Sequence, residues 1–463
     1  MSELKEDFAF ELEGKYTKAS MFIKTYEPGV INQVYDIINS PALEGLPVAI
    51  MPDAHEGKSG PCGLVYKIGK YVCPDHIGVD IGCSVSMTIL DKPVPVEKYV
   101  ELEHKIRAKI PFGFETHEKT IIDEKEFYKF LTNGFNKYKS MKPEVFSSLP
   151  DTVTEDWVLS TLSRVRMDVA KFYKSLGTVG GGNHFIEYDE DKDGNIAAFV
   201  LHFGSRMLGL KVCNYWMKMT KSASTYSKKE KEEYEKNLMK EFKKTYSQTH
   251  DSMANFKENF KEYHDSHLME KKDNYISGYL TGEDMNGYLC DMVFAQLYAK
   301  YNHMTVQKIL SDIVKIYGIS VDRVITSVHN YIDMEDWTVR KSSIRSYEGE
   351  EMVIPFNMRD GVAVCVGKSN NDWLCSAPHG AGRVLGRREA KKKLERGEFT
   401  MEEFKNDMEG IVSTSVVPSV IDESPRVYKD TNEIEELIQN TCEIEFRLFP
   451  KINCKASDGS EEQ

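Results

Sequence analysis

The sequence has no long apolar run, no paired cysteine framework and no excess of positive charge. No stretch reaches the roughly 18 apolar residues that a membrane-spanning helix needs. The acidic, mixed start over residues 1–16 is unlike a secretory signal. The nine cysteines are an odd number and are scattered, which favours core positions or metal ligation over disulfides. We therefore expect a cytoplasmic protein with no membrane association.

The charge balance limits what the surface as a whole can bind. The 463 residues include 60 Lys and Arg against 73 Asp and Glu, a net charge of −13. This argues against a protein whose entire surface grips nucleic acid. A local basic cleft is still compatible with it, because electrostatic fields depend on where charges lie. With 41% hydrophobic residues, the chain can bury a sizeable core.

Apolar periodicity predicts an α+β fold built as one large domain. Residues 1–48 have the pattern of a strand pair followed by a helix. Residues 49–92 are glycine-rich and loop-like until the predicted strand 84–90. The other expected helices cover 97–150, 155–176 and 283–317, and the other expected strands include 323–332, 352–357 and 361–367.

Residues 210–275 differ in kind from the rest of the chain. They are rich in lysine and glutamate with sparse apolar positions, which is typical of solvated helices. We interpret them as a charged helical insertion, and a plain helical hairpin without chemistry is the favoured reading. The acidic tail 456–463 is expected to be frayed.

Candidate metal ligands occur at several separated positions. Asp80 and Cys83 lie three residues apart in the glycine-framed loop "GVDIGCS", where a carboxylate and a thiolate could meet one cation or bridge two. His184 and His202 flank a hairpin-turn signal, "DKDGN", whose centre falls midway between them. A hairpin closed there brings the two imidazoles face to face, about 5 Å apart at Cβ.

His329 and His379 extend this set to six candidates. His329 ends a predicted strand, and His379 sits between Pro378 and Gly380 ahead of a basic run. Six ligands exceed what one tetrahedral site uses, whereas two metals sharing Cys83 would absorb them. Two-metal sites serve phosphoryl chemistry. The ligand mix leaves the metal open, since carboxylate favours manganese and thiolate favours zinc.

A glycine run supplies a possible anion cradle. "GTVGGGNH", residues 177–184, offers backbone N–H groups with little steric bulk. It is no Walker A motif, because no Lys-Ser or Lys-Thr step follows.

These motifs, in this order, resemble the RtcB family of RNA ligases. The resemblance spans nearly the whole chain apart from 210–275 and the tail. It is carried by the segments "MPDAHEGKSGPCG", "GVDIGC", "GGGNHFIE", "LHFGSR", the "HN" after a strand, and "SAPHGAGRVLGRREAKKKL". The family implies an RtcB-like catalytic domain with central sheets flanked by helices. It also implies ligation of RNA 3′-phosphate or 2′,3′-cyclic-phosphate ends to 5′-hydroxyl ends, with GTP and two manganese ions, in RNA repair or tRNA splicing.

The resemblance also implies residue roles. His379 would be the nucleophile that carries GMP. The metal ligands would be Asp80, Cys83, His184, His202 and His329. The guanylate would be faced by Asn183, Phe185, Glu187, Asn357 and Lys455. Phosphate or RNA would be held by Arg206, Arg383 and Arg387, and Asp53 and His55 would support the site from behind.

The local sequence suits a nucleophilic imidazole at His379. A neutral ring nitrogen can attack an α-phosphate, and a stiff Pro-His-Gly setting would aim it. The following helix would point its N-terminus toward the site, which favours anions. Arg383 and Arg387 are the better phosphate candidates there, and for Lys391–Lys393 a solvated face is an equal alternative.

Several positions depart from the family pattern. Pro74-Asp75-His76 replaces Pro-Gly-Gly, Ser84 follows Cys83 in place of glycine, and "IPFNMRDG" replaces Pro-Gly-Ser-Met-Gly. The resemblance therefore leaves nucleotide preference and the RNA substrate open, and His76 is expected to face solvent. The alternatives are a two-metal phosphoesterase, which needs only the metal ligands, and a non-catalytic RNA-binding protein, which would have lost some of them.

Overall fold

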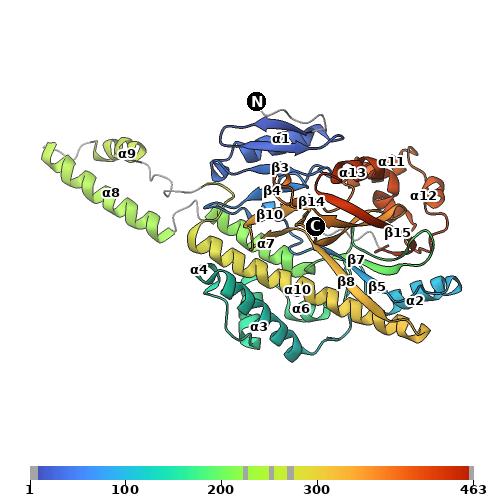
Figure 1. Cartoon of the computed structure of the whole chain (residues 1–463). Coiled ribbons are helices and arrows are strands. Elements are labelled where there is room, and N and C mark those ends of the chain that lie inside the picture. The colour runs from blue at the N-terminus through green and yellow to red at the C-terminus, as the bar shows by residue number, and fades with distance from the viewer. Residues whose placement is uncertain (1–8, 223–227, 250–254, 268–275, 458–463) are drawn as a thin grey trace.

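The computed structural model describes residues 9–222, 228–249, 255–267 and 276–457. Helices and strands alternate irregularly around three sheets, so the predicted α+β class is confirmed (Figure 1). No helix within these ranges is long and apolar enough to cross a membrane. The end of the predicted acidic tail, 458–463, lies outside the described residues.

A six-stranded sheet carries the N-terminal part of the chain. Its order is β1-β2-β3-β4-β10-β9, and only β2 and β3 are parallel neighbours. Helix α1 (Pro28–Ile38) packs on it through Val30 and Val34. The strands are β1 (Ala9–Glu13), β2 (Lys18–Phe22), β3 (Val48–Ile50), β4 (Leu64–Lys67), β9 (Tyr331–Asp333) and β10 (Thr338–Lys341).

A seven-stranded sheet forms the other half of the molecule. Its order is β12-β13-β15-β6-β7-β5-β8, with every neighbouring pair antiparallel. The sheet curls until its edge strands meet, because the Val353 N–H donates to Ser327 Oγ at 2.8 Å. The strands are β5 (Ser84–Leu90), β6 (Phe185–Glu190), β7 (Ala197–Phe203), β8 (Val321–Val328), β12 (Glu351–Asn357), β13 (Gly361–Gly367) and β15 (Cys442–Cys454).

A short two-stranded sheet is formed by segments that connect strands of the larger sheets along the chain. It pairs β11 (Ser343–Arg345), which follows β10, with β14 (Ser376–Pro378), which ends at the His379 loop.

Helices from all along the chain pack around the sheets (Figure 1). They are α2 (Tyr99–Lys109), α3 (Glu124–Met141), α4 (Pro143–Phe146), α5 (Glu155–Val165), α6 (Val169–Lys174), α7 (Arg206–Ser222), α8 (Lys228–Thr249), α9 (Phe256–Ser266), α10 (Gly282–Val314), α11 (Arg387–Glu395), α12 (Met401–Asp407) and α13 (Thr431–Ile438).

The continuous helix expected over 155–176 is wrong in one respect. Arg166 takes a left-handed conformation, with φ of 58°, and ends α5. Asp168 then caps α6 by accepting from the Lys171 N–H at 2.7 Å. The segment is therefore two helices with a sharp turn between them.

The charged segment over 210–275 divides into two parts. Its beginning belongs to α7, where Val212 and Trp216 are buried in the main core, so the expectation of solvated helices is wrong there. Helices α8 and α9 instead extend away from the body (Figure 1). Their aromatic residues face one another, with the Phe242 and Phe260 ring centroids 5.3 Å apart. That this segment is an insertion stays a prediction, and residues 223–227, 250–254 and 268–275 lie outside the described part.

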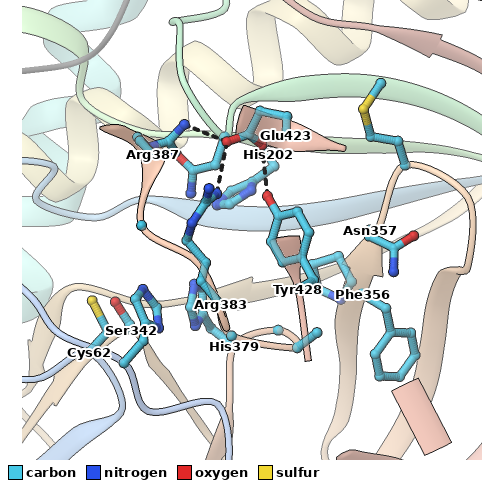
Figure 2. A pocket seen from close by; sticks show the side chains of 18 of the residues that line it. Cys62, His202, Ser342, Phe356, Asn357, His379, Arg383, Arg387, Glu423 and Tyr428 are labelled. Atoms are coloured by element: carbon cyan, nitrogen blue, oxygen red, sulfur yellow. Dashed lines mark hydrogen bonds and ion pairs between the residues drawn. The ribbon is translucent and has the colours of Figure 1, made fainter. Parts of the chain in front are cut away.

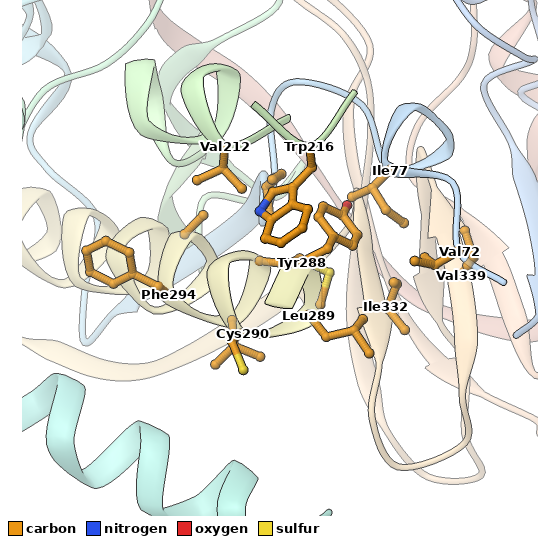
Figure 3. Packing of buried hydrophobic residues seen from close by; sticks show 14 of the residues in the cluster. Val72, Ile77, Val212, Trp216, Tyr288, Leu289, Cys290, Phe294, Ile332 and Val339 are labelled. Atoms are coloured by element: carbon orange, nitrogen blue, oxygen red, sulfur yellow. The ribbon is translucent and has the colours of Figure 1, made fainter. Parts of the chain in front are cut away.

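Trp216 joins α7 to the central helix α10 (Figure 3). Its indole Nε1 donates to Asp291 Oδ2 at 2.7 Å, and Asp291 also pairs with Arg164. The ring packs against α10 at Gly287, where an added Cβ would lie 2.6 Å from it. Trp216 therefore contributes both apolar burial and a charge-assisted hydrogen bond.

We predict that Trp216→Ala lowers the free energy of unfolding by about 3–5 kcal/mol, because a large cavity opens and Asp291 loses a donor. Trp216→Phe should cost less, since it keeps most of the packing. Denaturant unfolding followed by circular dichroism measures both. Val96→Ala, at a side chain 71% exposed, is the control. Equal stability of the Ala and wild-type proteins would contradict this role.

Candidate metal centre and adjoining cavity

The candidate metal ligands lie at one end of four adjacent strands. Cys83 precedes β5, His184 precedes β6, His202 is near the end of β7, and His329 follows β8. Because neighbours in the order β6-β7-β5-β8 are antiparallel, these positions lie at the same end of the four strands. The predicted hairpin between His184 and His202 is confirmed, since Phe185 pairs with His202.

The side chains form two groups that share the Cys83 thiol. One group is Asp80, Cys83 and His184, and the other is Cys83, His202 and His329, with the ligand atoms of each within 4.8 Å of one another. In the first, His184 Nε2 lies 2.9 Å from Asp80 Oδ2 and 3.6 Å from Cys83 Sγ. In the second, the Nε2 atoms of His202 and His329 are 3.2 Å apart. These groups contain five of the six candidates from the sequence, without His379, and two metal sites that share Cys83 stay a prediction.

The donor set fits divalent cations. Burial, followed by the neighbouring imidazoles, holds the pKa values of His202 and His329 well below their usual range. Both rings are therefore neutral, with lone pairs available to a metal. Asp80 Oδ1 is buried and accepts no hydrogen bond among the described residues. A buried carboxylate oxygen without a donor is suited to binding a cation. Gly204 permits this, because a Cβ there would lie 2.2 Å from that oxygen.

His379 adjoins the second group from another sheet. It follows β14, and its ring centroid is 4.7 Å from that of His329. Its Nδ1 donates to Asp53 Oδ2 at 2.7 Å, and its backbone N–H reaches the same oxygen at 3.2 Å. Asp53 is fully buried just beyond β3. The contact fixes the ring and leaves Nε2 as the unprotonated nitrogen.

Lys429 holds the backbone on both sides of Asp53. Its buried ammonium donates to the carbonyl oxygens of Pro52 at 2.7 Å and Ala54 at 2.8 Å. Burial lowers the pKa of Lys429 to about 8. The loop is tight, because a Cβ at Gly382 would lie 2.1 Å from the Asp53 carbonyl oxygen. Gly382, with φ of +74°, also accepts the Lys429 N–H.

A cavity of about 830 Å³ opens beside His379 (Figure 2). Its wall includes His202 and His379, whereas Asp80, Cys83, His184 and His329 lie outside the lining residues. The sequence candidates on the wall are Asn183, Phe185, Glu187, Asn357, Lys455, Arg383 and Arg387. The cavity therefore gathers most of the candidates that were expected to face a nucleotide.

The wall carries a compact charge cluster centred on Glu423 (Figure 2). Glu423 is buried and pairs with Arg387, with Lys455 at 3.0 Å and with Arg383 at 3.3 Å. Burial alone would raise its pKa, but these cations hold it well below the usual range. Tyr428 donates to the same carboxylate at 2.8 Å. Sequence reasoning missed Glu423 and Tyr428, since "DESPRVYKD" has no pattern that links it to Lys455.

Other candidates have polar atoms that are already engaged. Asn357 Nδ2 donates to Asp360 at 2.7 Å, and its Oδ1 accepts two backbone N–H groups in the β12–β13 turn. Glu187 accepts from Asn453 at 2.6 Å, and burial raises its pKa. Lys455 Nζ lies 5.5 Å from the Phe185 ring centroid.

Arg206 and His76 also lie apart from this cavity. Arg206 is outside the lining residues and donates to the Gly113 carbonyl at 2.6 Å and to Thr178 Oγ1 at 3.1 Å. His76 is buried, so the expectation that it faces solvent is wrong. Tyr66 Oη lies 3.0 Å from His76 Nδ1, and burial lowers the pKa of His76 to about 3.

Comparisons with known proteins agree on one family. A family model described as "tRNA-splicing ligase RtcB" matches residues 33–456. The chain is 26% identical over 426 residues to "RNA-splicing ligase RtcB1" of Escherichia coli ATCC 25922, covering 87% of this chain and 88% of the relative. It is 23% identical over 447 residues to "tRNA-splicing ligase RtcB" of Nanoarchaeum equitans, covering 84% and 83%. The protein of that name in Pyrobaculum aerophilum is 25% identical over 444 residues, covering 84% and 82%.

We predict that Cys83→Ala weakens cation binding at both groups, whereas His329→Ala weakens it at one. The reason is that only Cys83 belongs to both ligand sets. Manganese titration by calorimetry, with circular dichroism to verify folding, measures the number of sites in each variant. If Cys83→Ala binds as many ions as wild type with unchanged affinity, the shared-ligand arrangement is wrong.

Proposed function

Since this chain belongs to the RtcB family of tRNA-splicing ligases, we propose that it joins RNA ends through a GMP carried on His379. It is an RNA ligase of RNA repair or tRNA splicing. The substrates we propose are a 3′-phosphate or 2′,3′-cyclic-phosphate end and a 5′-hydroxyl end, with GTP as the activating nucleotide. One observation carries the proposal: two ligand groups sharing Cys83 adjoin an imidazole held by a buried carboxylate on a cavity wall.

His379 is the proposed nucleophile. Because Nδ1 keeps the ring proton and donates it in a hydrogen bond to Asp53, the Nε2 lone pair is free to attack the α-phosphorus of GTP. The new P–N bond replaces the bond to pyrophosphate, which leaves. The ring becomes cationic as this bond forms, and the Asp53 carboxylate stabilises that charge without taking the proton. A 2′,3′-cyclic phosphate would first be opened by water to a 3′-phosphate. The guanylyl group then passes to the RNA 3′-phosphate, and the 5′-hydroxyl displaces GMP.

Two manganese ions are the proposed metal cofactors. Asp80, Cys83 and His184 would hold one ion, and Cys83, His202 and His329 the other. When bound, such ions neutralise phosphate oxygens and lower the barrier to phosphoryl transfer.

The remaining wall residues are proposed to receive the nucleotide and the RNA phosphates. The Phe185 ring and the Lys455 ammonium form an apolar and cationic surface suited to a purine and its phosphates. Asn183, Glu187 and Asn357 complete the proposed nucleotide contacts, and Arg383 and Arg387 the phosphate contacts. A phosphate contact of Arg206 stays a proposal.

The phosphoesterase alternative gains no support from the geometry. A two-metal hydrolase has no need for the buried Asp53–His379 pair at the cavity wall. None of the nine cysteines forms a disulfide, which supports the proposal of a reducing, cytoplasmic location.

We predict that the protein incubated with manganese and GTP labelled on the α-phosphate acquires an acid-labile covalent label. His379→Ala should abolish the label, because His379 Nε2 is the proposed site of attachment. Asp53→Asn should lower the labelling rate by about 10²-fold or more, since the ring loses its carboxylate partner. A label that persists in His379→Ala would overturn the assignment of the nucleophile.

We also predict that Lys429 positions Asp53, so that Lys429→Met slows guanylylation while manganese binding is unchanged. Lys429→Arg is the matched control, because it keeps the positive charge on the two carbonyl groups. In wild type the rate should fall as pH rises through about 8, where Lys429 loses its proton. Lys429→Arg should lack that fall, since arginine stays protonated. The same pH profile in both proteins would exclude this role.

A further inference from the structure

Helix α11 carries two cations on the cavity wall, Arg388 and Lys392, to which the proposed reaction assigns no role. Both line the cavity and both are exposed. Within the described part of the chain, neither side chain makes an ion pair or a hydrogen bond. They lie four positions apart, so both project from the same face of the helix, about 6 Å apart along its axis. They therefore form a small, unneutralised positive surface, which we call the α11 pair.

The cations deeper in the wall differ, because carboxylates already hold them (Figure 2). Arg383 and Arg387 both pair with Glu423, and Arg387 also lies 3.0 Å from Asp422. These two carboxylates come from the short helix η6 (Pro418–Glu423), which packs against α11. Part of the inner positive charge is therefore cancelled within the protein, whereas the charge of the α11 pair is not.

The neighbouring lysines of the same helix are also paired. Lys391 Nζ lies 3.9 Å from Asp422, and Lys393 Nζ lies 3.3 Å from Glu398. Both lysines are outside the lining of the cavity. The basic run 391–393 thus divides into two kinds of residue: Lys392 belongs to the cavity wall, and the lysines on either side of it belong to ion pairs within the protein.

The acidic residues of the lining leave the charge at α11 uncancelled. Glu389, next to Arg388, is held by Arg396 at 2.6 Å. Glu56 shares a loop with Lys58, and Glu27 accepts the Glu56 N–H at 3.3 Å. The acidic side chains of that loop region therefore offset Lys58. The net positive charge of the exposed lining is concentrated at the α11 pair.

The cations of this wall become more exposed with distance along the chain from His379. The exposed fraction of the side chain is 11% for Arg383 and 27% for Arg387, and the α11 pair that follows is exposed. A polyanion whose end lies at His379 would therefore meet partly buried cations first and the exposed pair afterwards. Such a series suits a strand that carries a charge at its end and at each step behind it.

We propose that the α11 pair binds the phosphodiester backbone of the RNA strand that ends in a 3′-phosphate. The inference rests on the proposed function, which brings that end to His379. The terminal phosphate would lie at Arg383 and Arg387, and the phosphodiester groups behind it at the α11 pair, whose spacing of about 6 Å is close to that of neighbouring phosphates. The 5′-hydroxyl strand fits this series less well, because its reacting end carries no phosphate. Contacts of this kind hold a strand without reading its bases.

The test compares two fluorescent single-stranded RNAs of one sequence by anisotropy, with manganese and without GTP. The first ends in a 3′-phosphate and is labelled at its 5′ end. The second has a free 5′-hydroxyl, and its 3′ end carries the label and no phosphate. At about 0.1 M salt, Arg388→Gln/Lys392→Gln should weaken binding of the first RNA by about tenfold or more. The slope of log affinity against log salt should fall by about 1.4 for this RNA, and the second RNA should lose less than about threefold.

The matched control is Lys393→Gln/Arg323→Gln, which also removes one lysine and one arginine. Lys393 pairs with Glu398 and Arg323 with Glu351, and neither residue lines the cavity. This variant should bind both RNAs as wild type does, and circular dichroism verifies that both double variants are folded. Equal losses for the two RNAs, or equal losses in the two double variants, would overturn the proposal.

Guanylylation separates this inference from the proposed function, because the labelling step uses no RNA. If wild type takes no guanylyl label, the proposed function fails, and the anisotropy measurement still decides whether the α11 pair binds the strand. Labelling of Arg388→Gln/Lys392→Gln at increasing GTP concentration tests another occupant. If half-maximal labelling needs more GTP while RNA binding is unchanged, the pair holds the phosphates of GTP and the proposal is wrong.

Discussion

The contact between Asp53 and His379 joins the two halves of the site. The carboxylate comes from the loop after β3 of the six-stranded sheet, the imidazole from the loop after β14 of the short sheet, and the candidate metal ligands from strand ends of the seven-stranded sheet. Burying a carboxylate costs free energy unless it is hydrogen-bonded. Asp53 Oδ2 meets that requirement with both the ring and the backbone of His379, whereas the buried Oδ1 has no hydrogen-bond partner among the described residues. Lys429 hydrogen-bonds the carbonyl oxygens of the residues before and after Asp53 and so fixes this loop. The relative position of the sheets and the tautomer of the His379 ring therefore depend on one another.

The clustering of the candidate ligands could be predicted from the sequence because antiparallel topology makes it partly local. The turn signal between His184 and His202 was sufficient to bring those rings together, and the structure has them one residue from exact register. Cys83 and His329 flank strands that pair directly, with the His329 N–H donating to the Cys83 carbonyl at 2.8 Å. Residues that flank strand ends on the same side of a sheet lie close together, so the strand order alone is enough to predict their proximity.

The sequence could not predict contacts that depend on tertiary packing. Glu423 and Lys455 are separated by 32 residues, and Lys429 and Ala54 by 375, with no periodic pattern to link either pair. His76 is expected to face solvent because the resemblance gives it no role, yet Tyr66 and Tyr279 enclose it. Strands β3 and β4 were missed because they are short and lie among glycines, and α7 looked solvated because lysines flank its buried face.

The acidic total charge and the cationic cavity are reconciled by internal counterions. Arg383, Arg387, Lys391 and Lys455 face Glu423 and Asp422, so four cations and two carboxylates leave two positive charges in the cluster. Each guanidinium is held by a carboxylate before any ligand arrives, which limits the rearrangement that binding requires. An incoming phosphate meets this residual charge together with hydrogen-bond donors already in position. It must also tolerate the buried Glu423, which repels anions that cannot reach several cations at once. Under the proposed function, this arrangement is suited to a polyphosphate or an RNA backbone more than to a single small anion.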